Sequence, residues 1–178
     1  MLRPTLALAA IILPATAFAV GSGDSSPPTP SETTTECAEG LVFDIATQSC
    51  LSPEESTNDD SAMYLILREL AYAGRYADAA RVLEGFSDQS APEVLTYYGF
   101  VARKTGDLPG ALSYYAAALE ADPDNLLARS YLGQAYVEMG EVQLASAELS
   151  QIRQRGGRNS WPELALRLAI ESGQGFSY

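Results

Sequence analysis

From Ser61 onward, apolar residues recur every three or four positions, which is the spacing of one face of an α-helix. Met63, Ile66 and Leu70 fall on such a face, and breaks containing glycine or proline divide the pattern into short segments. The segments predict helical hairpins at 60–91, 92–125 and 126–159, and a single helix at 162–171. The predicted fold class is all-α, a solenoid of about three helix-turn-helix hairpins with a C-terminal capping helix, within a helical domain over 61–172.

A short pattern recurs at the predicted turn of each hairpin. Gly74, Gly106 and Gly140 are each followed five residues later by an alanine, and successive glycines are 32 and 34 residues apart. A period near 34 residues is typical of stacked helical hairpins. Such solenoids present extended surfaces that bind other chains. The sequence therefore predicts a class of function without naming a partner.

Polar residues mark where the helices begin and end. Ser90 and Glu93 predict a capping box at the second hairpin. The run Asp-Pro-Asp-Asn at 122–125 is expected to end one helix and cap the next. Ser160 is the expected cap of the last helix, and 173–178 are expected to form a loose tail.

The first nineteen residues have the pattern of an export signal. Arg3 precedes an apolar run from Leu6 to Leu13, and Ala17-Phe18-Ala19 is a small-x-small cleavage site. The alternative is an N-terminal anchor helix, but the apolar run is short for a bilayer. Cleavage would release the chain into an oxidising compartment, the periplasm or the cell exterior, with no stable membrane insertion.

The segment between the signal and the first helix is polar, except for a loop between two cysteines. Thirteen of the seventeen residues at 20–36 are Gly, Ser, Thr or Pro, a composition that cannot bury enough apolar surface to fold. Leu41, Phe43 and Ile45 alternate with other residues, as in a strand of a small hairpin. The predicted segments are a disordered linker over 20–36, a hairpin over 37–51 closed by a Cys37–Cys50 disulfide, and an acidic linker over 52–60.

Charge and composition exclude several functions. The formal net charge is −12, and residues 20–60 carry nine acidic residues and no basic ones. The chain has one lysine and no continuous basic stripe, so nucleic acid is a poor partner. It also has no histidine, the commonest general base and transition-metal ligand. We therefore expect no enzymatic activity, no cofactor and no metal site.

Residues 92–125 resemble the tetratricopeptide repeat family. The matching positions are Leu95, Tyr98, Gly99, Ala102, Gly106, Asp107, Ala111, Tyr115, Ala118 and Pro123. Residues 126–159 match through Leu132, Gly133, Tyr136, Gly140, Ala145 and Leu149, whereas 60–91 match less closely and are two residues short. The resemblance implies that the first helices of the hairpins line a concave groove that binds a peptide or helix of another protein.

The resemblance also implies which side chains are exposed in that groove. They are Tyr64, Arg68, Tyr72, Thr96, Phe100, Arg103, Lys104, Ser130, Gln134 and Glu138. The aromatic residues would act as apolar anchors, and the three cations would favour an acidic ligand. The alternative is that Tyr72 and Phe100 pack against neighbouring hairpins and that the cations are ordinary solvated groups.

The loop from Cys37 to Cys50, with Gly40, Phe43 and Thr47 between them, is similar to one loop of peritrophin-type chitin-binding modules. This resemblance implies contact with a glycan, and the alternative is a stapled hairpin that protects an exported arm. The function expected from the sequence is a protein–protein interaction module of the bacterial cell envelope. Binding of an envelope glycan through 37–50 and a purely structural role in an assembly are the alternatives.

Overall fold

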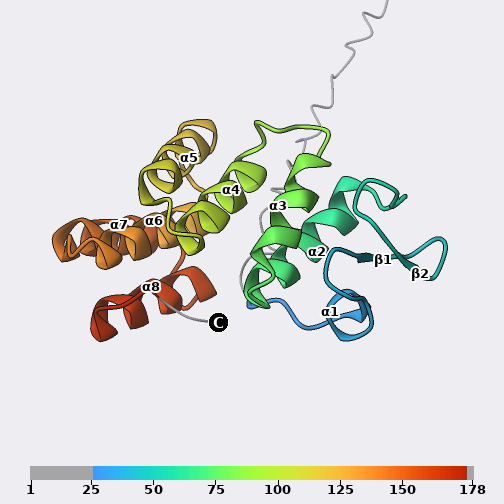
Figure 1. The fold of residues 1–178 in the computed structure, drawn as a ribbon. Coiled ribbons are helices and arrows are strands. Elements are labelled where there is room, and N and C mark those ends of the chain that lie inside the picture. The colour runs from blue at the N-terminus through green and yellow to red at the C-terminus, as the bar shows by residue number, and fades with distance from the viewer. Residues whose placement is uncertain (1–25, 176–178) are drawn as a thin grey trace, which may run out of the picture.

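The computed structural model describes residues 26–175 of the 178-residue chain. The predicted export signal and the last three residues of the predicted tail lie outside the described residues. Within 26–175 the chain is helical apart from one small two-stranded sheet near its N-terminal end (Figure 1). The predicted all-α solenoid of helical hairpins, with a final single helix, is confirmed.

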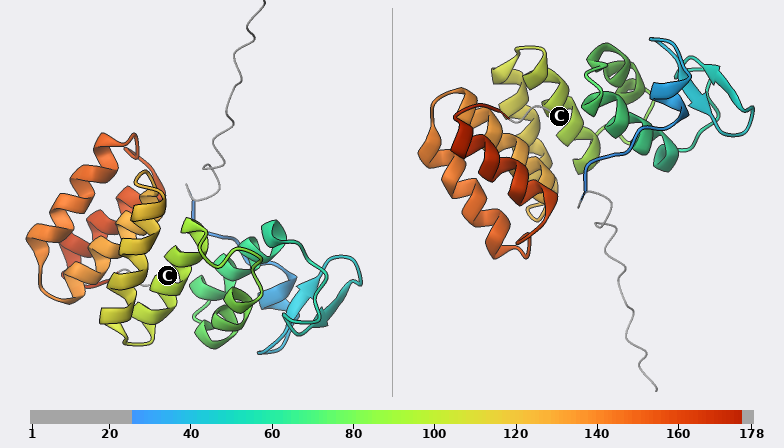
Figure 2. Two further views of the ribbon diagram at one scale, coloured as in Figure 1. Left: turned by 90° about the horizontal axis from the view of Figure 1, so that it is seen from above. Right: turned by 90° about the horizontal axis from the view of Figure 1, so that it is seen from below.

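The helices agree closely with the segments that the apolar pattern predicts. They are α2 Asp60–Tyr72, α3 Tyr76–Glu84, α4 Pro92–Lys104, α5 Leu108–Ala121, α6 Leu126–Glu138, α7 Val142–Gln154 and α8 Trp161–Ser172. Helices α2 and α3, α4 and α5, and α6 and α7 form the three hairpins, and α8 packs on both helices of the third (Figure 2). No helix among residues 26–175 is long and apolar enough to cross a membrane.

The recurring glycines are explained by the backbone of the turns. Gly74, Gly106 and Gly140 have φ angles of 77°, 94° and 80°, in the left-handed region that favours glycine. A methyl group added to any of the three would meet no atom within 4 Å. The requirement for glycine at these turns is therefore conformational rather than steric.

Close approach between helices explains a second set of small residues. A Cβ atom on Gly99 of α4 would lie 2.5 Å from the ring of Tyr115 in α5. A Cβ atom on Gly133 of α6 would lie 2.6 Å from the methyl groups of Leu166 in α8. Both Tyr115 and Leu166 are fully buried, so neither side chain has free space to move into. These two glycines set how closely α4 packs on α5 and α6 on α8.

The predicted capping box at Ser90 and Glu93 is wrong. The hydroxyl of Ser90 donates instead to Asp88 Oδ1 over 2.6 Å, and the N-cap of α4 is Ala91, whose side chain makes no capping bond. Helix α4 begins with Pro92, which has no N–H group to satisfy and whose fixed φ suits the first helical position. The predicted caps at Asn125 and Ser160 are confirmed, since their side chains accept from the amides of Ala128 and Glu163.

The N-terminal arm is folded where the sequence predicts a linker. Helix α1 (Glu32–Thr35) lies inside the predicted disordered segment, and strands β1 (Val42–Asp44) and β2 (Ser49–Leu51) form the predicted hairpin. The strands pair antiparallel with Phe43 opposite Cys50, and the predicted disulfide between Cys37 and Cys50 is present. We call residues 31–58 the N-terminal module.

Contacts with the first hairpin explain why this polar segment is ordered. Glu69 of α2 is 6% exposed, and its carboxylate accepts from the backbone amides of Ser31 and Thr34 at 2.7 and 3.1 Å. The hydroxyl groups of both residues donate to the same carboxylate. A buried carboxylate at the start of α1 is stabilised by these charge-assisted hydrogen bonds. Local composition did not reveal this partner because it lies more than thirty residues away.

A second set of polar contacts holds the disulfide loop on α3. The guanidinium of Arg75 donates to the carbonyl groups of Thr33 and Ala38 at 3.0 and 2.9 Å. Asp78 accepts from the amide of Gly40 at 2.9 Å. Val42 of β1 is fully buried and belongs to the same apolar core as α2 and α3. The module thus covers the outer side of the first hairpin, which would otherwise be an open end of the solenoid.

Asp44 ties the predicted acidic linker back onto the module. Its carboxylate accepts from the backbone amide of Thr47 at 2.8 Å and from that of Thr57 at 2.5 Å, and also from the hydroxyl groups of Thr47, Ser56 and Thr57. These hydrogen bonds, first those from the Thr47 and Thr57 amides, hold the pKa of Asp44 far below its usual range. The segment leading to α2 is therefore part of the folded structure.

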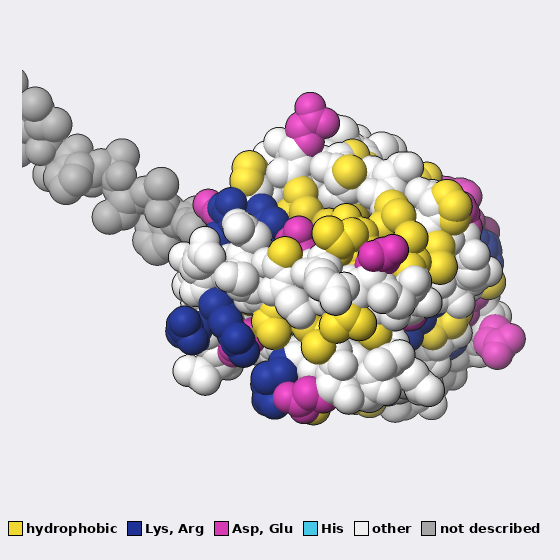
Figure 3. All heavy atoms as spheres, turned by 90° about the vertical axis from the view of Figure 1, so that its left-hand side faces the viewer, with side chains coloured by type: hydrophobic (Ala, Val, Ile, Leu, Met, Phe, Trp, Pro, Cys, Tyr) yellow, Lys and Arg dark blue, Asp and Glu magenta, His cyan; other side chains and the backbone are white. Residues whose placement is uncertain are grey.

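The opposite end of the solenoid is covered less completely. Figure 3 shows the face at the left of Figure 1, where hydrophobic side chains are exposed among polar ones. Val142 and Leu144 of α7 are 39% and 47% exposed. Only α8 follows the third hairpin within the described residues, so part of the outer surface of α7 faces solvent.

We expect Asp44→Asn to lower the melting temperature at pH 7, because an amide presents one oxygen to donors that a carboxylate satisfies with two. The folded-state pKa of Asp44 is lowered, so its ionised form stabilises the fold above about pH 4, the unfolded-state pKa. That stabilisation is lost as the pH falls below this value. The difference in melting temperature between parent and variant should therefore shrink towards pH 2.

The matched control for this prediction is Glu39→Gln, which changes an exposed carboxylate of the same module. Circular dichroism melts of the three chains between pH 7 and pH 2 provide the measurement. A constant difference between parent and Asp44→Asn across this range would contradict the role assigned to the ionised carboxylate.

Candidate functional site

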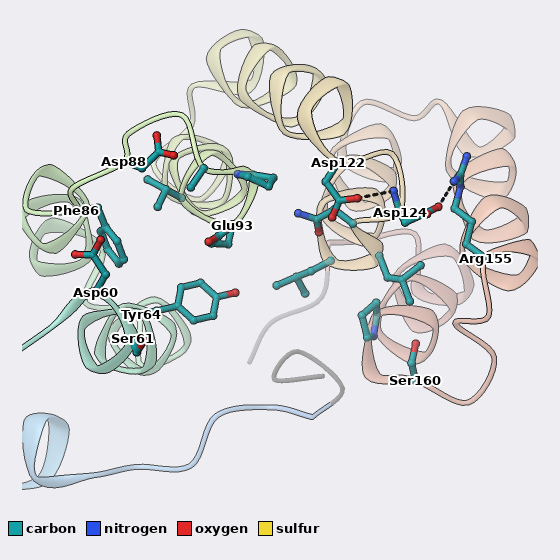
Figure 4. Close-up of a pocket in the computed structure, with 17 residues that line it drawn as sticks. Asp60, Ser61, Tyr64, Phe86, Asp88, Glu93, Asp122, Asp124, Arg155 and Ser160 are labelled. Carbon is teal, nitrogen blue, oxygen red and sulfur yellow. Dashed lines mark hydrogen bonds and ion pairs between the residues drawn. The ribbon is translucent and has the colours of Figure 1, made fainter. Parts of the chain in front are cut away.

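The inner surface of the solenoid is formed by α2, α4, α6 and α8, and we call it the concave face. The N-terminal ends of these helices surround a pocket of about 800 Å³ (Figure 4). The residues that line it are Asp60, Ser61, Tyr64, Phe86, Asp88, Ala91, Pro92, Glu93, Val94, Asp122, Asp124, Asn125, Leu126, Leu127, Arg155, Ser160 and Pro162. Its volume is in the range of sites that hold a small ligand or a few side chains.

The pocket combines an apolar interior with an acidic rim. Tyr64, Phe86 and Leu127 supply apolar surface, whereas five carboxylates contribute to the lining. Among the described residues, the one cation in the lining is Arg155, which is paired with Asp124 (Figure 4). The lining is therefore strongly negative, and a ligand with a positive group and an apolar group would complement it.

The acidic residues lie at the pocket because helices begin and end there. Asp60 and Glu93 are in the first turns of α2 and α4, where a negative charge interacts favourably with the helix dipole. Asp122 is the C-cap of α5 in the loop that leads to α6. Asp88 accepts from the hydroxyl and the amide of Ser90, and these bonds lower its pKa. The positions of all these carboxylates are therefore explained by the way each helix begins or ends at the hairpin connections.

Further along the concave face, packed aromatic rings take the place of an open groove. The ring of Tyr97 lies 5.9 Å from that of Phe100 and 5.7 Å from that of Tyr64, measured between centroids. Phe100 in turn lies 4.8 Å from Tyr131 of α6. Tyr97, Phe100 and Tyr131 are fully buried, so the rings join α2, α4 and α6 as a core.

A hydrogen-bonded bridge crosses the concave face from the first hairpin to the last helix. The indole N–H of Trp161, the first residue of α8, donates to the hydroxyl of Tyr72 over 2.9 Å. The Tyr72 hydroxyl also lies 3.0 Å from the hydroxyl of Tyr131. The ring of Tyr72 stacks on that of Phe100, with the two centroids 6.1 Å apart. This bridge connects residues 89 positions apart and brings α8 against α2.

Two cations of α4 lie against the aromatic rings. The guanidinium carbon of Arg103 is 5.5 Å from the Phe100 ring and 5.9 Å from the Tyr131 ring, within the range of a cation–π contact. Arg103 is paired with Glu138 of α6 at 2.5 Å. The Lys104 ammonium lies 5.9 Å from the Phe100 ring, and its burial, followed by the charge of Arg103, lowers the pKa of Lys104.

The expectation that the ten groove residues are exposed is wrong for most of them. Six are buried: Arg68, Thr96, Phe100, Arg103, Ser130 and Gln134. Tyr64, Tyr72 and Lys104 are half-buried, and Glu138 is the one member of the set that is exposed. The physical reason is that the large rings fill the inner curve of the solenoid. The alternative in which Tyr72 and Phe100 pack against neighbouring hairpins is the correct one.

The polar members of this set are engaged within the fold. Thr96 donates to the carbonyl of Pro92 and accepts from the side-chain amide of Asn125 at 3.1 Å. Gln134 donates to Ser130 and accepts from Arg103, both at 3.4 Å. These side chains connect α4 to α6, and none of them is free for a partner in the structure as described.

The open pocket is the part that sequence reasoning missed. Of the ten predicted residues, only Tyr64 lines it. The pocket also contains Glu93 of the predicted capping box, and Leu126 and Pro162, the first residues of the predicted segments 126–159 and 162–171. They lie together because the N-terminal ends of α4, α6 and α8 do. Trp161, the single tryptophan of the chain, follows the predicted cap at Ser160, and the sequence pattern assigns it no role of its own. The signal available was the repeated position of acidic residues at the start of the first helices.

Two family models, both described as Tetratricopeptide repeat, match this chain at residues 64–125 and 102–166. Together they cover α2 through the start of α8, which is more than half of the chain. The chain belongs to the tetratricopeptide repeat family. No curated protein matches it.

Proteins built from tetratricopeptide repeats generally mediate binding between proteins and act as non-catalytic scaffolds. Among the residues that the structure describes, no group of three or more acidic or cysteine side chains is arranged to hold a metal ion. The family membership therefore supports protein–protein interaction as the general function.

We expect Tyr72→Phe to lower the free energy of unfolding by about 1 kcal/mol, the typical value for one net hydrogen bond. The indole N–H resonance of Trp161 should also move and exchange faster, because its acceptor is removed. The single tryptophan makes this resonance unambiguous in an NMR spectrum.

The control is Tyr114→Phe, which removes a hydroxyl from an exposed tyrosine of α5. An indole resonance that responds equally to both substitutions, or to neither, would contradict the bridge between α8 and α2.

Proposed function

We propose that this chain is an exported adaptor that binds a segment of another protein in the pocket at the N-terminal ends of α2, α4, α6 and α8. The observation that carries the proposal is the combination of apolar interior and acidic rim in an open pocket of about 800 Å³. Membership of a family of protein-binding repeats supports a protein or peptide as the ligand.

The chemistry of the pocket favours a basic segment with an apolar anchor. A lysine, arginine or amino group would face the carboxylates of Asp60, Glu93 and Asp122, while an apolar side chain would reach Tyr64 and Leu127. This ligand differs from the acidic one expected from the sequence. That expectation rested on cations of the concave face, and Arg103 is instead paired with Glu138 inside the fold.

The N-terminal module supports this function indirectly, by completing the first hairpin. Both backbone groups of Gly40 are used for docking, since its amide donates to Asp78 and its carbonyl accepts from Arg81 at 3.0 Å. These contacts favour the stapled hairpin over a loop that reaches out to a glycan. The disulfide and the export pattern of the first nineteen residues support a periplasmic or other envelope location in a bacterium.

A selection of peptides from a random library on the immobilised protein, without its first nineteen residues, should yield sequences with lysine or arginine near an apolar residue. Glu93→Lys should weaken binding of the selected peptides roughly tenfold at low salt, because it places a like charge at the rim. Screening should reduce this effect at high salt.

Glu120→Lys is the matched control, since Glu120 is an exposed carboxylate of α5 that does not line the pocket. Selection of acidic peptides, or of peptides that bind both variants as well as they bind the parent, would overturn the assignment of the pocket.

Expression of the full chain in a Gram-negative host tests the location. We expect the periplasmic fraction to contain a chain that begins at Val20 and has no free thiol by mass spectrometry. Retention of residues 1–19 on membrane-bound protein would favour the anchor helix, and a reduced chain in the cytoplasm would contradict export.

A further inference from the structure

The outer surface of α7 is an uncovered end of the solenoid, and hydrophobic side chains are exposed there (Figure 3). Val142 and Leu144 are exposed on α7, and Met139 is exposed in the turn that precedes it. Helix α8 packs on α6 and on part of α7. In a longer solenoid a further hairpin would cover the remaining surface of α7.

Charge distinguishes α7 from the other helices. The chain has a net charge of −12, and every other helix within residues 26–175 exposes at least one carboxylate, for example Glu120 of α5. The exposed residues of α7 carry no charge. Its two charged residues are half-buried and paired within the fold, Glu148 with Arg129 and Arg153 with Glu163. Like charges oppose the approach of two copies elsewhere on this acidic surface, and along α7 this repulsion is absent.

The two ends of α7 carry opposite charges. Glu141 is its N-cap and Arg155 is its C-cap, and both are exposed. They lie about 21 Å apart along the helix axis. A second α7 that runs antiparallel to the first would therefore bring Glu141 of each copy beside Arg155 of the other. Arg155 is also paired with Asp124, and a guanidinium has donors for more than one carboxylate.

The other end of the solenoid is not open to a second copy. There the N-terminal module covers the first hairpin, with Val42 in the shared apolar core and Arg75 bonded to the carbonyl of Thr33. A head-to-tail row of copies needs both ends open, so the module blocks it. The open end at α7 can pair with an identical end, and such a contact closes as a two-fold dimer.

We propose that this protein forms a dimer in which α7 of one copy packs antiparallel on α7 of a second copy, about a two-fold axis. Ala147 and Ser150 lie near its centre, on the side of the helix opposite the buried Ala145. Their size lets the two helices pack about 8–10 Å apart. Val142 and Leu144 are then covered by the C-terminal half of the partner helix.

The size of the contact determines how strong this dimer is. Helix α7 offers a footprint of about 20 by 10 Å, which is smaller than the roughly 800 Å² per partner of a standard interface. The dimer therefore forms at micromolar or higher concentrations and exchanges rapidly. This inference goes beyond the proposed function, because none of residues 142–154 lines the pocket.

Light scattering on the protein without its first nineteen residues, from about 1 to about 300 μM, tests the dimer. The mass of the parent should rise from that of one chain to that of two and no further. Ala147→Glu and Ala147→Lys should each weaken the dimer at least tenfold, because a residue near the two-fold axis meets its own copy and like charges repel. An equal mixture of the two variants should dimerise again, because the facing charges are then opposite.

The matched control is Ala116→Glu, which changes an exposed alanine of α5 and should dimerise as the parent does. Circular dichroism verifies that each variant is folded. A parent that stays monomeric throughout, as it would if α7 bound a different protein, overturns the proposal. A dimer that survives Ala147→Glu, a mass that grows beyond two chains, or a mixture that stays monomeric while the parent dimerises also overturns it. The peptide selection reports on the pocket, so either proposal can fail without the other.

Discussion

A helical hairpin cannot bury its own apolar surface, and the rest of this structure depends on that constraint. Stacking three hairpins covers the surfaces between them but leaves one open at each end of the row. At the N-terminal end, the polar arm folds over α2 and α3 and places Val42 in their core. The arm is too short and polar to fold by apolar burial alone, so the buried carboxylate of Glu69 and the guanidinium of Arg75 hold it through its backbone.

The same constraint explains the closed centre of the concave face. Helix α8 covers the third hairpin, and the curve of the solenoid brings its first residue, Trp161, against Tyr72 of α2. The rings of Phe100 and Tyr131 fill the space between, and Arg103 is buried over them with Glu138 as its counter-charge. A buried guanidinium without such a partner would be strongly destabilising. The concave face is therefore a second core along most of its length and is open at the N-terminal ends of its helices.

The parts of the fold that could be predicted from the sequence depend on neighbours along the chain. The apolar period, the turn glycines such as Gly106 and the cap at Asn125 are local, and the helices follow from them. The parts that could not be predicted depend on distant partners. Helix α1 is ordered by its hydrogen bonds to Glu69 of α2. Phe100 is buried because Tyr131, an aromatic residue of the next hairpin, packs against it. The expected capping box failed because α4 begins one residue later than expected, with Ala91 as its N-cap, and the Ser90 hydroxyl turns back to donate to Asp88.

The distribution of charge on the concave face follows from the parallel course of its first helices. Their N-terminal ends lie together. Acidic residues stabilise helix N-termini, so Asp60 and Glu93 both lie at this end and form part of the pocket rim. Their C-terminal ends also lie together, where Arg103 and Lys104 occupy the last turn of α4, as the helix dipole favours. The face is therefore acidic at its pocket end, whereas at the other end the charge of Arg103 is offset by Glu138 and α2, α6 and α8 have no basic residue in their last turns. A bound segment whose cationic end enters the pocket would have one preferred direction along the face, and this polarity would follow from the way in which the fold gathers the helix starts.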